Sequence, residues 1–122
     1  MEITKVTEKD VEIAILSSDD IVITDVQSAL DLMATVRYTT NCNHLILDKS
    51  AICDEFFDLK TRLAGEILQK FVNYQFKLAI TGDFSVYPSE SLRAFIYECN
   101  NGNAIFFLPS SEEAIERLSG LP

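Results

Sequence analysis

Residues 2–16 alternate apolar and polar side chains in two short runs, ITKV and VEIAIL, with the charged segment EKD between them. Alternation with a period of two places successive side chains on opposite faces of a strand. Two such runs joined by a short polar segment are typical of a β-hairpin. The pattern therefore predicts that the chain begins with two antiparallel strands.

Four later segments repeat apolar residues at the spacing of a helix that buries one face. The first is expected to begin at Thr24, because Gln27 follows at the spacing of a capping box, and to cover about three turns. The second, RLAGEILQKFVNY, is expected to be the longest. The third, in PSESLRAFIYECNNG, should be capped by Ser89. The fourth, in SSEEAIERLSG, has a second predicted capping box, from Ser110 to Glu113.

Three short apolar runs, HLILDK, FKLAITGD and NAIFFLP, alternate with these helices. An unbroken apolar run of this length is typical of a strand covered on both faces of a parallel sheet, so Leu45, Ile46 and Leu47 are expected to be central and buried. The resulting order is ββαβαβαβα. It predicts one α/β domain over residues 1–122, with a mixed, mainly parallel, five-stranded sheet.

Composition narrows the class of protein. A chain of 122 residues with 48% hydrophobic residues can bury a core without disulfides or a structural metal. Apolar runs are far shorter than the roughly 20 residues of a membrane-spanning helix, and the first residues lack signal-peptide features, so a cytoplasmic protein is expected. With a net charge of -9 and no adjacent Lys or Arg, neither nucleic acid nor membrane is expected as a partner. Three cysteines without a CxxC unit favour a reducing compartment.

The order of elements resembles that of the STAS domain, which is shared by sulphate transporters and bacterial anti-sigma-factor antagonists. The matching features are the hairpin, the strands LILDK and FKLAITGD, the loop FFDLKT and the last helix, SSEEAIERL. In those antagonists an Asp precedes a serine that a partner kinase phosphorylates. Here Asp58 matches the aspartate, while Leu59 and Lys60 stand in place of serines. The resemblance implies a STAS-like fold and a surface that meets partner proteins.

The block from FFDLKT to NNG resembles more closely an uncharacterised bacterial family known as domain of unknown function 4180. This resemblance covers nearly the whole chain. It implies the same fold and a bacterial, cytoplasmic origin. Because the family has no assigned activity, the resemblance implies no mechanism.

Acidic residues follow two of the predicted parallel strands, among them Asp48, Asp58 and Asp83. Ligands of open α/β sheets usually bind at the carboxyl ends of the strands, where gathered carboxylates suit Mg²⁺. The alternative function is therefore a small metal- or ligand-dependent enzyme that uses these three aspartates. The simpler interpretation is that they are solvated and complement helix starts, as a net charge of -9 makes frequent. On that interpretation no metal and no cofactor is expected.

The remaining candidates for chemistry favour structural roles. His44, the single histidine, begins a strand that Cys53 follows, so these two and Cys42 do not converge as a zinc site. The sequence shows no nucleophile that the single histidine could activate as a base. No catalytic residue is therefore expected, and an enzyme is the less favoured interpretation. Gly65 within a helix is expected to permit close packing, and Gly82 a sharp exit from a strand.

Two loops, EFFDLKT and DFSVYPS, place pairs of bulky aromatic residues beside acids after two central strands. Such loops either bind something or pack together, with one aromatic of each pair entering the core. The leading interpretation is a non-enzymatic regulatory or protein-interaction domain that meets a protein partner through these loops. A homodimerising module remains an alternative. The expected surface consists of Phe56, Phe57, Asp58, Lys60, Thr61, Phe84 and Tyr87.

Overall fold

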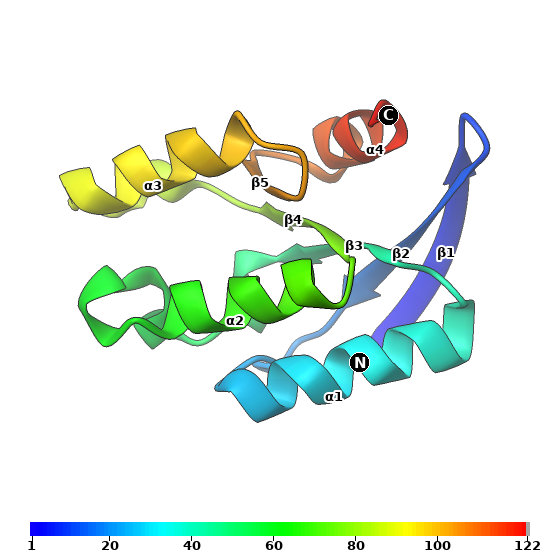
Figure 1. Cartoon of the computed structure of the whole chain (residues 1–122), viewed down its shortest axis with the longest axis horizontal. Coiled ribbons are helices and arrows are strands. Elements are labelled where there is room, and N and C mark those ends of the chain that lie inside the picture. The colour runs from blue at the N-terminus through cyan, green and yellow to red at the C-terminus, as the bar shows by residue number, and fades with distance from the viewer. Residues whose placement is uncertain (122) are drawn as a thin grey trace.

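The computed structural model describes residues 1–121 and has the α/β architecture that the alternating pattern predicts (Figure 1). Pro122, the last residue of the predicted domain range, lies outside the described residues. The helices and strands are β1 (Glu2–Glu8), β2 (Val11–Ser17), α1 (Val26–Thr40), β3 (His44–Asp48), α2 (Leu63–Asn73), β4 (Lys77–Thr81), α3 (Glu90–Asn100), β5 (Ile105–Leu108) and α4 (Ser111–Ser119). Short 3-10 turns lie in the loops after β3 and β4, namely η1 (Lys49–Ala51), η2 (Asp54–Phe57), η3 (Leu59–Thr61) and η4 (Phe84–Val86). Within residues 1–121, no helix is both long enough and apolar enough to cross a membrane.

The strands form one mixed sheet in the order β1-β2-β3-β4-β5. β1 pairs antiparallel with β2, and β2 to β5 pair parallel to one another, which confirms the predicted mainly parallel sheet. β3 is therefore the middle strand. Its Leu45, Ile46 and Leu47 are 0%, 1% and 1% exposed, as the short apolar run predicted.

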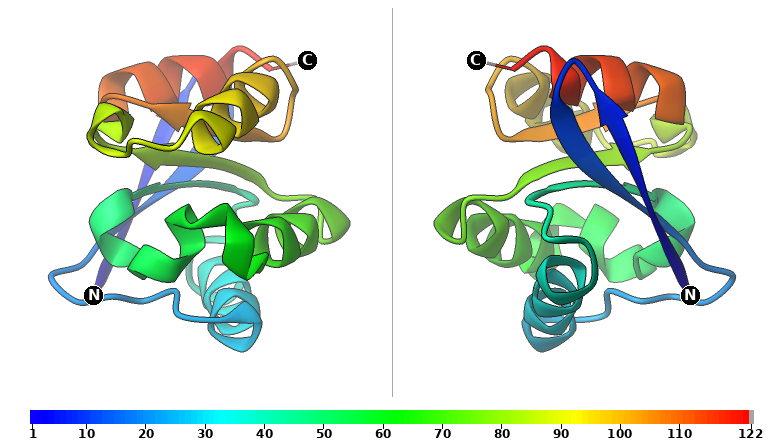
Figure 2. Two further views of the ribbon diagram at one scale, coloured as in Figure 1. Left: turned by 90° about the vertical axis from the view of Figure 1, so that its left-hand side faces the viewer. Right: turned by 90° about the vertical axis from the view of Figure 1, so that its right-hand side faces the viewer.

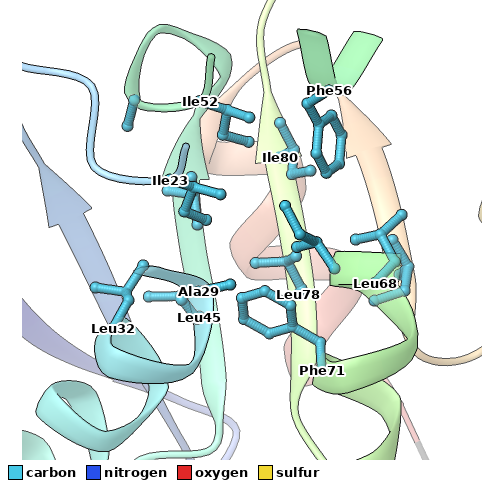
Figure 3. Close-up of a cluster of buried hydrophobic side chains, with 14 of the residues drawn as sticks. Ile23, Ala29, Leu32, Leu45, Ile52, Phe56, Leu68, Phe71, Leu78 and Ile80 are labelled. Atoms are coloured by element: carbon cyan, nitrogen blue, oxygen red, sulfur yellow. The ribbon is translucent and has the colours of Figure 1, made fainter. Parts of the chain in front are cut away.

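Alternate side chains of the central strands enter two separate hydrophobic clusters. On one face, Leu45 and Leu78 lie in a cluster to which α1, α2 and α3 contribute side chains; Figure 3 shows Leu78 beside Phe71 of α2. On the other face, Ile46 packs in a cluster to which α4 contributes Ala114 and Leu118. Figure 2 shows α1 and α4 on opposite sides of the sheet. Both faces of the central strands are covered, which is why their sequences are apolar without alternation.

The boundaries of α1 correct two expectations. Asp25, not Thr24, caps the helix: its carboxylate accepts the N–H of Ser28 at 2.8 Å, and the Ser28 hydroxyl accepts the N–H of Asp25 at 3.0 Å. This capping box lies one residue later than the predicted one, because a carboxylate complements the positive helix end better than a hydroxyl. α1 has 15 residues and α2 has 11, so α1 is the longer and covers about four turns.

Polar residues at the end of α1 explain why this helix is longer than the three turns that the sequence predicts. The hydroxyls of Thr39 and Thr40 each donate to the carbonyl oxygen four residues earlier, both at 2.7 Å. These side chains satisfy their own hydrogen bonds within the helix, so a threonine pair that breaks the apolar pattern does not break the helix. The predicted serine caps of α3 and α4 are present: Ser89 accepts the N–H of Leu92, and Ser110 that of Glu113. In the described residues Glu113 does not return a hydrogen bond to the N–H of Ser110, so the capping box predicted for α4 is only half formed.

At the free edge of β5, one side chain pairs with the strand backbone. Asn100, at the end of α3, accepts the N–H of Phe107 at 2.8 Å and donates to its carbonyl oxygen at 3.1 Å. The amide thereby reproduces the pairing of a neighbouring strand at one residue, which obstructs the addition of another strand there. β1 forms the opposite edge, where Lys5 lies 3.5 Å from Glu12.

The two glycines that the sequence singled out differ in their surroundings. Gly65 is exposed, and a Cβ atom built on it would have no neighbouring atom within 4 Å, so the expected close packing is wrong. Gly82 has φ +146°, and a Cβ there would lie 2.8 Å from the side chain of Lys49. The strand exit at Gly82 therefore requires glycine, whereas α2 does not require it at Gly65.

Gly65→Ala is expected to stabilise the protein by about 0.5 to 1 kcal/mol, because alanine restricts the unfolded chain and fits the helix without a clash. Gly82→Ala is expected to cost about 1 to 3 kcal/mol, because its backbone conformation strains any other residue. Urea unfolding of both variants measures the two changes. A loss of stability in Gly65→Ala would contradict the open surroundings of that residue.

Candidate functional site

The strongest candidate site lies at the edge of the sheet where β3 and β4 end. The loops that follow these strands, residues 49–62 and 82–89, lie at this edge and face the viewer in the left view of Figure 2. The first loop contains three consecutive 3-10 turns and the second contains one. In parallel sheets this edge is the usual place for binding.

Each of the three candidate aspartates caps one of these turns. Asp48 accepts the N–H of Ser50 at 3.0 Å, and Asp58 accepts that of Lys60 at 3.2 Å. Asp83 accepts the N–H of Ser85 at 2.9 Å, and its hydrogen bonds with the Ser85 side chain and backbone hold the pKa of the Asp83 carboxyl below its usual value. A carboxylate that accepts the N–H two residues later is a common stabiliser of turns.

These aspartates do not form a metal site together. Among residues 1–121, no three His, Cys, Asp or Glu side chains lie together in a way that could hold a metal ion. Asp48, Asp58 and Asp83 are instead turned toward three separate turns. His44 lies at the other end of β3 and contacts the side chain of Asn43 at 3.0 Å.

The aromatic residues of the two loops pack against one another. The ring of Phe57 stacks on that of Tyr87, with centroids 5.1 Å apart and an interplanar angle of 15°. Phe57 also lies 6.2 Å from Phe84 and meets the ring of Phe56 edge-on at 4.9 Å. Phe84 in turn meets Phe107 of β5 edge-on at 5.4 Å. The aromatic rings thus join the loops to each other and to the sheet.

The exposure expected for Phe56 and Phe57 is wrong, because these side chains are 1% and 5% exposed. Both belong to the larger hydrophobic cluster, where Phe84 and Tyr87 pack over them and remain partly exposed. Asp58, Lys60 and Thr61 are exposed, as expected. The binding role of this surface stays a prediction.

Lys49 links the first loop to the second. Its ammonium donates to the carbonyl oxygen of Asp83 at 2.9 Å and lies 4.8 Å from the centre of the Tyr87 ring. Its hydrocarbon chain occupies the space that a side chain at position 82 would need. Sequence reasoning missed this role of Lys49, although the glycine after the β4 strand was a signal that something approaches closely there.

Thr61 holds the end of the first loop against α2. Its hydroxyl lies 2.8 Å from the carbonyl oxygens of both Glu55 and Asp58 and accepts the N–H of Leu63 at 3.2 Å. The chain then passes through Arg62 with φ 65° before the helix begins. One hydroxyl therefore fixes the path of η2, η3 and the start of α2.

Beside the aromatic rings, the surface has a shallow hollow of about 260 Å³ between η4 and α3. Apolar side chains of Phe84, Tyr87, Leu92 and Ile96 line it, and Arg93 is the charged residue of the lining. Val86, in the adjoining turn, is 61% exposed. Neither Val86 nor this hollow was among the residues predicted from sequence, because α3 and η4 form the hollow together.

A family model described as a domain of unknown function, DUF4180, matches residues 8–118. No curated protein and no solved structure was found to match the chain. The likeness to STAS domains therefore stays a prediction.

Phe57→Ala is expected to destabilise the protein by about 3 to 5 kcal/mol, because it leaves a cavity beneath the aromatic rings. Tyr97→Ala, which truncates an aromatic residue that is 71% exposed, is the matched control and should change stability by less than about 0.5 kcal/mol. Chemical denaturation of both variants tests this pair. Equal, small effects would show that Phe57 does not support the loops.

Proposed function

The chain belongs to the DUF4180 family, and we propose that it is a non-enzymatic regulatory domain of the bacterial cytoplasm that binds a partner protein through the loops after β3 and β4. The binding surface consists of Val86, the hollow beside it and the exposed parts of Phe84 and Tyr87. Asp58, Lys60 and Thr61 supply neighbouring polar groups. The cysteines of the described chain are free, which supports a reducing compartment.

The observation that carries this proposal is the rigid support beneath an exposed apolar group. Val86 is 61% exposed, yet its turn is held by the stack of Phe57 on Tyr87 and by the hydrogen bond from Lys49 to Asp83. A loop that is already ordered loses little conformational entropy when it binds. Apolar groups at the centre of a surface with charged groups around it are also the usual anatomy of a protein interface.

The use of the carboxylates supports a binding role over catalysis at this edge. Asp58 and Asp83 accept backbone N–H groups of their own turns, so their position follows from loop geometry. The hydroxyl of Thr61 is likewise engaged with the loop backbone. These hydrogen bonds hold the turns and so shape the surface, and the Ser85 hydroxyl, which donates to Asp83 at 2.5 Å, belongs to the same turn.

Charge favours a different protein over a second copy as the partner. Each chain carries a net charge of -9, so two copies repel one another at long range. A partner with basic residues around an apolar anchor would be attracted by the same field, and the anchor side chain would enter the hollow beside Val86. The isolated protein is accordingly monomeric on this proposal.

Photo-crosslinking tests the surface directly. With p-benzoylphenylalanine in place of Val86, irradiation in cells that naturally produce the protein should give a discrete adduct with one other protein. The same group in place of Tyr38, which is 92% exposed on α1, is the control and should not give that adduct. Binding of the identified partner should fall at least about 10-fold in Val86→Asp, because a desolvated carboxylate replaces an apolar contact.

Two outcomes would contradict the proposed binding surface. One is an identical adduct from both positions, which would place the contact elsewhere. The other is unchanged partner binding in Val86→Asp at an unchanged melting temperature. If light scattering finds a dimer that Val86→Asp dissociates, the surface binds a second copy and the charge argument is wrong.

A further inference from the structure

A second cavity lies at the same edge of the sheet, near the start of α4. It measures about 260 Å³ and lies at the carboxyl ends of β2, β3 and β4, where Ser111 of α4 contributes to its wall. Ile15, Ile46 and Leu47 supply apolar wall. The polar residues of its lining are Ser17, Ser18, Asp48, Ser50, Thr81 and Ser111. The lining shares no residue with the hollow beside Val86.

Asp48 is the charged residue of this lining, and its carboxylate is held in place from two sides. One oxygen accepts the hydroxyl of Thr81 at 3.2 Å, and the other accepts the N–H of Ser50 at 3.0 Å. Partial burial raises the pKa of Asp48, but the hydrogen bonds with Ser50 and Thr81 and the positive charge of Lys49 outweigh it, so the pKa lies below its usual value. A carboxylate offers about four acceptor positions, so an ionised Asp48 can still accept hydrogen bonds from a ligand.

Thr81 contributes a nearly buried hydroxyl group to the cavity. The residue is 5% exposed, and its hydroxyl donates to Asp48 across the ends of two paired strands. Because the hydroxyl hydrogen is engaged with Asp48, the remaining lone pairs of its oxygen can accept from another donor. The cavity therefore offers a fixed negative charge and adjacent hydroxyl oxygens, which together suit a donor with several hydrogens.

The charges around the cavity select the class of ligand. An anion is disfavoured, because Asp48 is the charged residue of the lining and two hydrogen bonds fix its carboxylate there. A divalent metal ion is disfavoured as well, because among residues 1–121 no three potential ligands of the His, Cys, Asp and Glu types lie together. A primary ammonium group needs one carboxylate and further acceptor oxygens, and its hydrocarbon chain can lie on the apolar wall.

We propose that this cavity binds a small aliphatic amine, with the ammonium group donating to Asp48 and the hydrocarbon chain lying against Ile15, which is partly exposed. The volume is below the roughly 300 to 1,000 Å³ of pockets for drug-sized ligands, so the amine has a short chain. This site is independent of the proposed protein-binding surface, since the Asp48 cavity and the Val86 hollow lie in different parts of the edge.

The test uses n-butylammonium chloride as the probe and amide NMR spectra of the full chain as the readout. Saturable shifts are expected at Ser50, Thr81 and Ser111, whereas sodium butyrate at the same ionic strength should give none. Asp48→Asn is expected to weaken binding at least about 10-fold, because a hydrogen bond to a charged group is lost. Asp83→Asn is the matched control: it removes the same kind of turn cap outside the cavity and should leave the affinity within about two-fold.

A second variant separates binding from folding. Ser111→Phe places a bulky side chain at an exposed residue of the cavity lining and leaves Asp48 unchanged, so it should abolish the shifts while the melting temperature stays close to that of the parent protein. The proposal is overturned if n-butylammonium gives no saturable shift, if butyrate binds equally well, or if Asp48→Asn and Asp83→Asn weaken binding to the same extent. Unaltered binding in Ser111→Phe would also overturn it.

Discussion

The parallel pairing of β3 with β4, buried on both faces, is the constraint on which the rest of this structure depends. The register sets Leu45 opposite Leu78 and Asp48 opposite Thr81, so the apolar bodies of the strands and their polar ends coincide. Both strands therefore leave the core at one level, and their long loops emerge side by side. The hydrogen bond from Thr81 to Asp48 joins the two strand ends at 3.2 Å. Both loops of the candidate site begin at the ends of these two strands.

Two loops that emerge together must cover the end of the core, and aromatic residues do so here. Phe57 of the first loop lies under Tyr87 of the second, and Lys49 spans the gap to the backbone of Asp83. The burial of Phe57 stabilises the loops, while the outer side of the same assembly leaves Val86 exposed. Stability and surface shape are thus consequences of one packing arrangement.

The two faces of the sheet are covered by different numbers of helices, and a separate hollow lies on each side at the same edge. Three helices cover one face, and the hollow beside Val86 opens between η4 and α3 on that side. α4 covers the other face, and its first residue, Ser111, reaches the cavity at Asp48. One hollow is apolar with a cation at its edge, whereas the other is polar with an anion. Their chemistry suits different ligands, so the edge can serve two binding events.

Local patterns in the sequence determined the order of the elements, the burial of Leu45 to Leu47 and the caps at Ser89 and Ser110, because each depends on residues within about one helical turn or strand. They also located the loops and turn-forming aspartates of the candidate site. They did not show that Phe57 meets Tyr87, that Lys49 passes Gly82, or that Gly65 has open space around it. Those facts depend on strand register, which brings together segments some 30 residues apart. Only tertiary structure decides them, because no local periodicity encodes which distant side chain will fill a given space.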